Sequence, residues 1–211
     1  MKRLVIMAMM LLGLHAFAQE DNVLPEKTQK IIVQIEEANA DVCTVCGGFR
    51  QTKKIFANGR KVNSEGMLYY ACPDRFAMHY YEPEGELMVI SGDRMAMTRG
   101  KKNSVYDLQK NAPMRSLSST LLLSMQGKVM EIASLNDADV AASIEEYGIK
   151  VSLFARKKAS KGYSMIELVY NPGGRGLKSM VMVEFNGNST VYDISGADLN
   201  VEVGSEPFAI E

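Results

Sequence analysis

The sequence predicts an α+β fold in which a single antiparallel sheet curls into a barrel or half-barrel. Three observations predict it. Many short strand-like runs are separated by Gly, Pro and Asn turns, several strands are apolar on both faces, and two amphipathic helices are available to cover the concave side. The 211 residues fit one domain, or two small ones at most. We therefore expect one curved sheet around one hydrophobic interior.

Residues 1–18 have the pattern of a signal peptide. Two basic residues precede a continuous apolar stretch from Leu4 to Leu14, and Ala16-Phe17-Ala18 supplies the small residues that a signal peptidase recognises. The stretch is too short to span a bilayer, although an uncleaved anchor is the alternative. We expect cleavage near Ala18, export, and a single domain over residues 19–211.

Charge and histidine content argue against several classes of function. The 24 basic and 25 acidic residues give a net charge of -1, whereas a nucleic-acid binder needs a positive surface. His15 lies in the predicted signal peptide, which leaves His79 as the single imidazole of the exported chain. Ser91 and Ser189 lack the glycine-elbow context of a nucleophile and a second partner. We therefore expect no enzymatic activity, no cofactor and no contact with nucleic acid.

Residues 21–41 are predicted to form the first helix. Apolar residues recur at helical spacing, Ile31 and Ile35 among them, and charged side chains occupy the opposite face. Asp21 or Asn22 could cap its N-terminus. The apolar stripe indicates that this helix packs against the sheet.

A β-hairpin is predicted to follow this helix. Asn58-Gly59 is the strongest two-residue turn signal in the chain, because both residues tolerate positive φ. It would join a strand over 48–57 to a strand over 60–72. A strict two-residue turn sets the register so that the following residues face each other: Phe49 with Leu68, and Val45 with Cys72.

Three cysteines remain in the exported chain, and a structural disulfide is the preferred interpretation. A one-residue bulge at Gly47-Gly48 would place Cys46 opposite Cys72, within disulfide reach. Cys43 and Cys46 have C-x-x-C spacing, but the helix that normally follows a redox motif of this kind is missing. A zinc site formed by the three cysteines and His79 is a further alternative, although we expect no metal.

The rest of the chain alternates strands with one more helix. Residues 116–134 are predicted to form a second amphipathic helix whose apolar stripe includes Leu121, Leu122 and Met125. Gly, Pro and Asn punctuate the strand-like runs. These runs are Phe76–Tyr81, Leu87–Ser91, Met95–Arg99, Val140–Tyr147, Ile149–Arg156, Tyr163–Tyr170, Leu177–Phe185 and Thr190–Ile194.

The surplus of apolar residues indicates a cavity. Both faces of the strand over 163–170 are apolar, which a sheet with one wet face would not need. The chain has 15 methionines, and such flexible, polarisable side chains suit surfaces that accept varied apolar shapes. On composition alone, a methionine-rich core is the favoured explanation. The pattern permits an apolar ligand site between the sheet and the helices.

Several segments together resemble the periplasmic outer-membrane lipoprotein carrier family, the LolA/LolB-like proteins. Their order is similar to that family over roughly residues 25–208, although each segment is only loosely constrained. The segments are Gly48-Phe49-Arg50-Gln51-Thr52-Lys53, Ser64-Glu65-Gly66-Met67-Leu68-Tyr69-Tyr70, Pro73-Asp74-Arg75-Phe76 continuing to Pro83, Leu87–Gly92, Lys178–Phe185 and Gly187-Asn188-Ser189-Thr190-Val191-Tyr192.

The resemblance implies an unclosed β-barrel covered by helices, with an apolar cavity for the acyl chains of lipoproteins. It implies a monomeric periplasmic carrier that moves lipoproteins toward the outer membrane, between an inner-membrane donor complex and an outer-membrane acceptor. A module that senses lipids or lipoproteins and regulates a protein partner is the alternative. The residues implied for the cavity are Leu68, Tyr70, Phe76, Met78, Tyr80, Ile90, Leu121, Leu122 and Met125, with Ile31 and Ile35 on a lid helix.

One position departs from the family pattern. Many carriers have a basic residue just before the Pro of the Pro-x-Arg-Phe segment, where it bonds to the lid, and this chain has Cys72 there. Arg75 keeps the later basic position and is the candidate latch. His79 alternates with the inward-facing residues of its strand, so we expect it on the convex surface rather than as a catalytic base.

Overall fold

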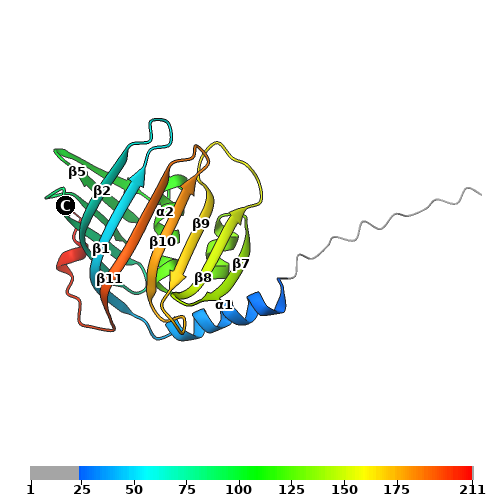
Figure 1. Ribbon diagram of the computed structural model, residues 1–211. Coiled ribbons are helices and arrows are strands. Elements are labelled where there is room, and N and C mark those ends of the chain that lie inside the picture. Colours follow the sequence, from blue (N-terminus) through cyan, green and yellow to red (C-terminus); the bar gives the residue numbers. More distant parts are fainter. Residues whose placement is uncertain (1–23, 211) are drawn as a thin grey trace, which may run out of the picture.

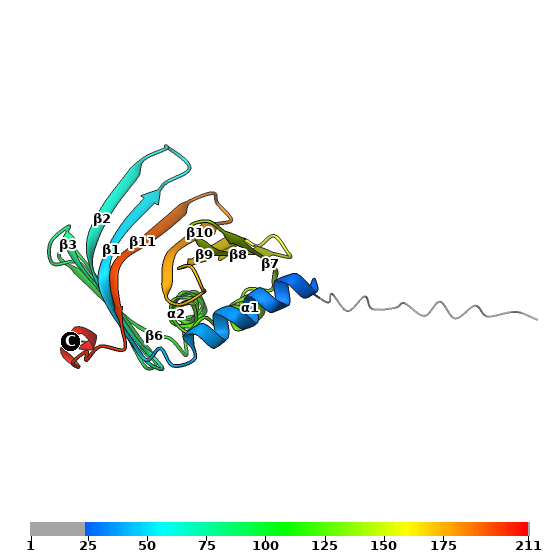
Figure 2. The same ribbon diagram turned by 60° about the horizontal axis from the view of Figure 1, so that its bottom comes forward.

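The computed structural model describes residues 24–210, so the predicted signal peptide and its cleavage site lie outside the described residues. The chain forms one sheet of 11 antiparallel strands that curves around helix α2 without closing (Figures 1 and 2). The predicted α+β class and unclosed barrel are therefore confirmed. No helix within residues 24–210 has the length and apolar character needed to cross a membrane.

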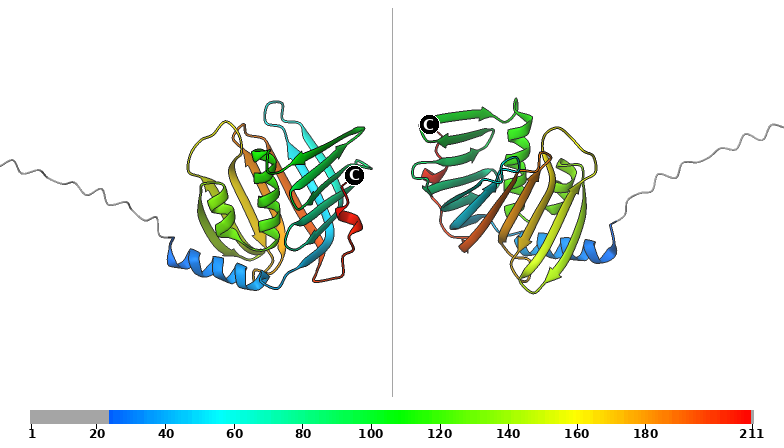
Figure 3. Two further views of the ribbon diagram at one scale, coloured as in Figure 1. Left: turned by 180° about the vertical axis from the view of Figure 1, so that it is seen from behind. Right: turned by 45° about the horizontal axis from the view of Figure 1, so that its top comes forward.

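The sheet is built from two runs of hairpins. The strand order is β6-β5-β4-β3-β2-β1-β11-β10-β9-β8-β7, so β6 and β7 are its edges and the pairing of β1 with β11 joins the halves. Helices α2 and α3 connect the two edge strands and lie on the concave side of the sheet (Figure 3). The elements are α1 Glu26–Asn39, β1 Thr44–Lys54, β2 Lys61–Ala71, β3 Arg75–Glu82, β4 Leu87–Ser91, β5 Arg94–Arg99, β6 Lys102–Asp107, α2 Ala112–Met125, α3 Val129–Leu135, β7 Ala138–Glu145, β8 Gly148–Ala155, β9 Tyr163–Tyr170, β10 Leu177–Glu184, β11 Ser189–Leu199 and the 3-10 turn η1 Glu206–Phe208.

Helix α1 lies across one end of the barrel, where it packs against β7 and α3 (Figure 2). Its buried face includes Ile31 and Ile35, as the apolar spacing predicts. The helix begins at Glu26 after Pro25, and the predicted capping residues Asp21 and Asn22 lie outside the described residues. The apolar face of α1 therefore covers one end of the barrel.

The predicted β1–β2 hairpin exists, but its register was wrong by two residues. Lys54 pairs with Lys61, so residues 55–60 form the connection instead of a two-residue turn. Gly59 adopts a φ of 68° there, in agreement with the turn signal. The longer connection moves every partner, and the observed pairs are Phe49 with Gly66 and Val45 with Tyr70.

The disulfide joins Cys43 to Cys72, and the predicted Cys46–Cys72 pair was wrong. The register explains the difference, because Cys46 lies opposite Tyr69 and keeps a free thiol. A register irregularity does occur at Gly47, but on the β11 side of β1. Since two of the four candidate zinc ligands are bonded to each other, that alternative is excluded.

Two further differences concern the middle of the chain. The helix predicted over 116–134 is broken into α2 and α3 at Gly127, whose φ is 70°. A Cβ at this position would lie 3.0 Å from the carbonyl oxygen of Ile35, so the break lets α1 approach closely. Strand β6 was not predicted, because its alternation is largely polar. The other predicted strands are confirmed within a few residues at their ends.

The C-terminal segment packs on the convex face of β3 and β4. Phe208 is buried against a small apolar cluster that includes Ala77 and Val89. The ring Nε2 of His79 lies 2.9 Å from the carbonyl oxygen of Pro207. His79 is therefore on the convex surface, as its alternation predicts, and it helps to hold the chain end.

Candidate functional site

The deep interior of the barrel is packed. Most of the predicted cavity residues belong to one continuous core and are at most 3% exposed. Tyr80 and Leu122 are only partly buried at its margin. The fully packed members are Leu68, Tyr70, Phe76, Met78, Ile90, Leu121 and Met125 from the predicted cavity, together with Ile35; Ile31 is 4% exposed.

A cavity of about 390 Å³ remains between the inner face of the sheet and the first turns of α2. We call it the mouth cavity. Strands β1, β3, β4, β5, β6, β9, β10 and β11 contribute to its lining, and Tyr80 is the one predicted cavity residue among the lining residues. Its apolar lining is rich in thioethers and consists of Met88, Met97, Met114, Leu117 and Met182.

A second cavity of about 640 Å³, the side cavity, adjoins the mouth cavity at the N-terminal end of α2. It lies between residues 112–117 and the connection from β8 to β9, where Lys157 and Lys161 contribute to its lining. The two cavities share Met114, Leu117, Tyr163 and Glu184. Two hollows of ligand size therefore meet at the N-terminal half of α2.

Tyrosine hydroxyls line the mouth cavity beside the methionines. The hydroxyl of Tyr80 donates to Oε1 of Gln51 at 2.8 Å, and the Tyr80 ring meets Phe49 edge-on with centroids 5.0 Å apart. Burial raises the pKa of Tyr80 and Tyr163 well above the ordinary value, and raises the pKa of Tyr192 to about 12. These phenols stay neutral at physiological pH, so they offer hydrogen bonds without adding negative charge.

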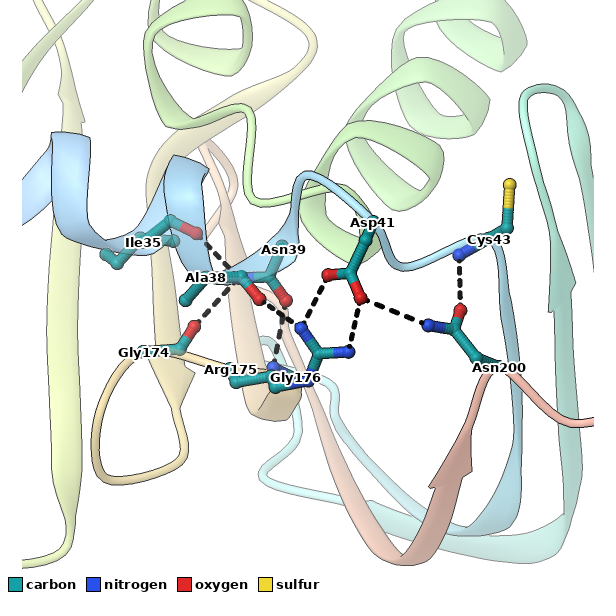
Figure 4. A network of polar contacts seen from close by, with 9 residues as sticks. All are labelled: Ile35, Ala38, Asn39, Asp41, Cys43, Gly174, Arg175, Gly176 and Asn200. Atoms are coloured by element: carbon teal, nitrogen blue, oxygen red, sulfur yellow. Dashed lines mark hydrogen bonds and ion pairs between the residues drawn. The ribbon is translucent and has the colours of Figure 1, made fainter.

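Helix α1 is attached at its C-terminal end by a polar network (Figure 4). The buried Asn39 side chain donates to the carbonyl oxygens of Ile35 at 2.7 Å and Gly174 at 2.8 Å, and its Oδ1 accepts from the Gly176 amide at 2.9 Å. Asn39 therefore joins the end of the helix to the β9–β10 connection.

The ion pair between Arg175 and Asp41 and the side-chain amide of Asn200 extend the same network toward β1. Arg175 donates to both carboxylate oxygens of Asp41, at 2.6 and 3.0 Å, and to the carbonyl oxygen of Ala38. The hydrogen bond from Arg175 lowers the pKa of Asp41 below its ordinary value. Asn200 accepts from the Cys43 amide at 2.8 Å, which continues the chain of contacts to the disulfide (Figure 4).

Helix α2 is held at its C-terminal end. Gln126 donates to the carbonyl oxygen of Pro73 at 3.0 Å, and the Tyr170 hydroxyl donates to the carbonyl oxygen of Ser124 at 3.0 Å. The predicted latch, Arg75, lies instead on the convex side, with its guanidinium carbon 5.2 Å from the ring centroid of Phe208. Gln126 and Tyr170 therefore hold α2, and Arg75, which the resemblance implied as the latch, does not.

Residues 40–211 match the sequence model of a family described as "Outer membrane lipoprotein carrier protein LolA". The chain belongs to the LolA family. The match covers the whole sheet, both helices on its concave side and the last residue of the chain. The family therefore provides a lipoprotein carrier or binder fold, and the resemblance seen in the sequence is confirmed.

Solved structures share the LolA-family fold at low sequence identity. An uncharacterized conserved protein from Thermus thermophilus is 10% identical, with a TM-score of 0.50 over 88% of this chain and 95% of that one. MucB is 11% identical, with a TM-score of 0.50 over 89% of this chain and 64% of that one. A putative outer membrane lipoprotein-sorting protein domain from Vibrio parahaemolyticus is 10% identical, with a TM-score of 0.46 over 87% and 96%. No curated protein matches the sequence.

Several lining residues of the mouth cavity were not predicted as site residues. Lys102 and its strand neighbours Ser104 and Tyr106 are among them. Strand β6 was missed, so its inward-facing side could not be assigned. The alternation of Lys102, Ser104 and Tyr106 was the signal that could have shown it.

Proposed function

We propose that this LolA-family chain is a periplasmic carrier that binds the acyl chains of lipoproteins and moves them toward the outer membrane. The family match across the barrel and the helices is the observation that carries the proposal. An inner-membrane donor, an outer-membrane acceptor and a monomeric state belong to the same proposal. No enzymatic step is part of it.

The two cavities support the proposal by their size and lining. Their volumes of about 390 and 640 Å³ lie in the range of ligand sites. Each acyl CH₂ that leaves water contributes about 0.8 kcal/mol, so a chain of ~14 carbons contributes on the order of 10 kcal/mol. A carrier has to offer comparable apolar surface, and the methionines of the mouth cavity provide a deformable part of it.

The packed core beneath α2 would enlarge this surface if the helix moved. The side chains that α2 now covers, Met78 and Ile90 among them, would become walls of a deeper hollow. The polar contacts described for α2 hold its C-terminal end, and Gly127 separates it from α3. We infer that acyl chains enter at the mouth cavity and displace the N-terminal half of α2.

The test is binding of an acyl probe to the exported protein, with Leu117→Asp as the variant. Leu117 lines both cavities and is only partly buried, so a carboxylate there should weaken binding at least tenfold while the fold survives. Val105→Asp is the control, because Val105 is 43% exposed and lies on β6 outside both cavities. Equal binding by the two variants would contradict the proposal.

The identity of the cargo needs a second experiment. Affinity capture of the exported protein, followed by mass spectrometry of bound material, should recover several different lipoproteins if the chain is a carrier. Recovery of free lipid with one stable protein partner would instead favour the sensor. Circular dichroism of each variant establishes that the fold is retained.

A further inference from the structure

The mouth cavity has a cationic rim that its apolar lining does not require. Arg99 and Lys102 face each other across the β5–β6 hairpin, and both line the cavity. Lys53 lines it from β1. Like charges placed directly opposite each other in a sheet are destabilising, so the pair costs stability where it stands.

These cations have no acidic partner within residues 24–210. None of the ion pairs found there involves Arg99, Lys102 or Lys53. Glu184 is the one acidic side chain on the described lining. Its Oε2 accepts from the side-chain amides of Asn186 at 2.9 Å and Asn188 at 3.4 Å, so it is engaged by its own turn.

The rim lies above a graded interior, as the inward-facing residues of two strands show. Along β5 the order is Arg99, then Met97 on the cavity wall, then fully buried Met95. Along β1 the order is Lys53, then Gln51, then buried Phe49. Each strand therefore passes from positive charge through polarisable or polar groups to apolar core, which is the profile of an amphiphile with an anionic head.

A second pair of opposed cations lies away from the cavity, so a cationic hairpin end does not by itself line the cavity. Lys54 and Lys61 also face each other across a hairpin, β1–β2, and are exposed like Arg99 and Lys102, but neither lines the cavity. Two hairpin ends thus carry opposed cations, and only the β5–β6 pair is turned toward the hollow. This arrangement provides an internal control for any effect of charge alone.

We propose that the rim formed by Lys53, Arg99 and Lys102 binds the phosphate of an anionic lipid head group while the acyl chain enters the cavity below. The proposal rests on the proposed function, because the chain of the ligand must occupy the acyl site. It adds a preference for an anionic head. A zwitterionic head group carries the same phosphate, but its cation is repelled by the rim, so the rim discriminates between head groups by their net charge.

The experiment compares two lysolipids that share one palmitoyl chain. Binding of lysophosphatidylglycerol and of zwitterionic lysophosphatidylcholine is measured below their micellar concentrations, with the exported protein at low salt. We expect the anionic lipid to bind about tenfold more tightly. Arg99→Gln with Lys102→Gln should reduce the ratio to below twofold, and Lys54→Gln with Lys61→Gln should leave it unchanged. Glycerol 3-phosphate, which has the head without the chain, should bind at least a hundredfold more weakly.

The outcomes separate this proposal from the proposed function. Equal affinity for the two lysolipids, or a preference that survives in the rim variant, would overturn the rim while leaving the acyl site standing. Tight binding of glycerol 3-phosphate alone would show an anion site without an acyl ligand, and would also overturn it. Failure to bind either lysolipid would contradict the proposed function itself.

Discussion

Replacing Asn39 with Ala tests how α1 is held on the barrel. The side chain is 2% exposed and makes three hydrogen bonds, to Ile35, Gly174 and Gly176. At about 1 kcal/mol for each bond, the loss amounts to roughly 3 kcal/mol. The variant also leaves the buried backbone groups of Gly174 and Gly176 without this partner, so we expect a loss of about 2–4 kcal/mol.

Urea unfolding followed by circular dichroism measures this loss directly. For a domain of this size a loss of about 3 kcal/mol lowers the melting temperature by roughly 6–12 °C. Gln34→Ala is the matched control, because Gln34 donates from the same helix to the same connection, at 3.3 Å to Gly173, but is exposed. We expect the control to change stability by less than about 0.5 kcal/mol. A similar small loss for Asn39→Ala would refute the reasoning.

A second variant and amide hydrogen exchange show which part of the structure loses stability. Asn39→Asp keeps an acceptor for the Gly176 amide but places a carboxylate against the carbonyl oxygens of Ile35 and Gly174. We expect it to destabilise at least as much as the alanine variant at neutral pH. Amide hydrogen exchange should accelerate in α1 before it does in β1 or β2, because the network joins the helix to the sheet.

Three further predictions concern stability. Replacing Cys43 and Cys72 with Ser should cost about 3–4 kcal/mol in urea unfolding, since the bridge spans 29 residues, and thiol titration of the native protein should find one reactive cysteine. Asp41→Asn should lower the free energy of unfolding at neutral pH, and the variant and the parent should become equally stable in acid. The reason is that the pKa of Asp41 is lower in the folded state, so its ionised carboxylate stabilises the fold fully above the unfolded pKa of about 3.9. This stabilisation is lost as the pH falls through the folded pKa. Tyr170→Phe should cost about 1 kcal/mol by removing its bond to α2. Tyr70→Phe should be neutral or stabilising, since within residues 24–210 the buried hydroxyl of Tyr70 has only a contact with Gln126 that falls short of hydrogen-bond geometry; a loss of more than about 1 kcal/mol would contradict this.

Sequence patterns predicted the elements far better than their register. Alternating apolar residues and turn residues identified most strands, because both signals depend on neighbours in the chain. The register of β1 with β2 depends on the length of the connection, and Asn58-Gly59 did not reveal that strand pairing ends at Lys54 and Lys61. The disulfide assignment failed with the register, since the two-residue shift and the absence of the expected bulge on the β2 side together place Cys43 instead of Cys46 beside Cys72.

The sequence predicted an apolar interior, but it did not predict which part of that interior stays open as a cavity. The family resemblance implied that Met78 and Ile90 face inward, and both are buried inside the barrel. Which inward positions remain open depends on where α2 lies, and that is set by contacts between distant segments such as Gln126 with Pro73. The mouth cavity therefore required the structure.

An unclosed sheet leaves two strands whose outer backbone groups could pair with another molecule. β7 is shielded in part by the helices α1 and α3 that pack against it. β6 has no such cover from the described part of the chain, but Lys102 and Asp107 stand exposed along its short length, and charged side chains discourage strand addition. Lys102, which we propose binds the head group of a ligand, therefore also helps to keep the edge of the sheet from pairing with other molecules when the protein is concentrated.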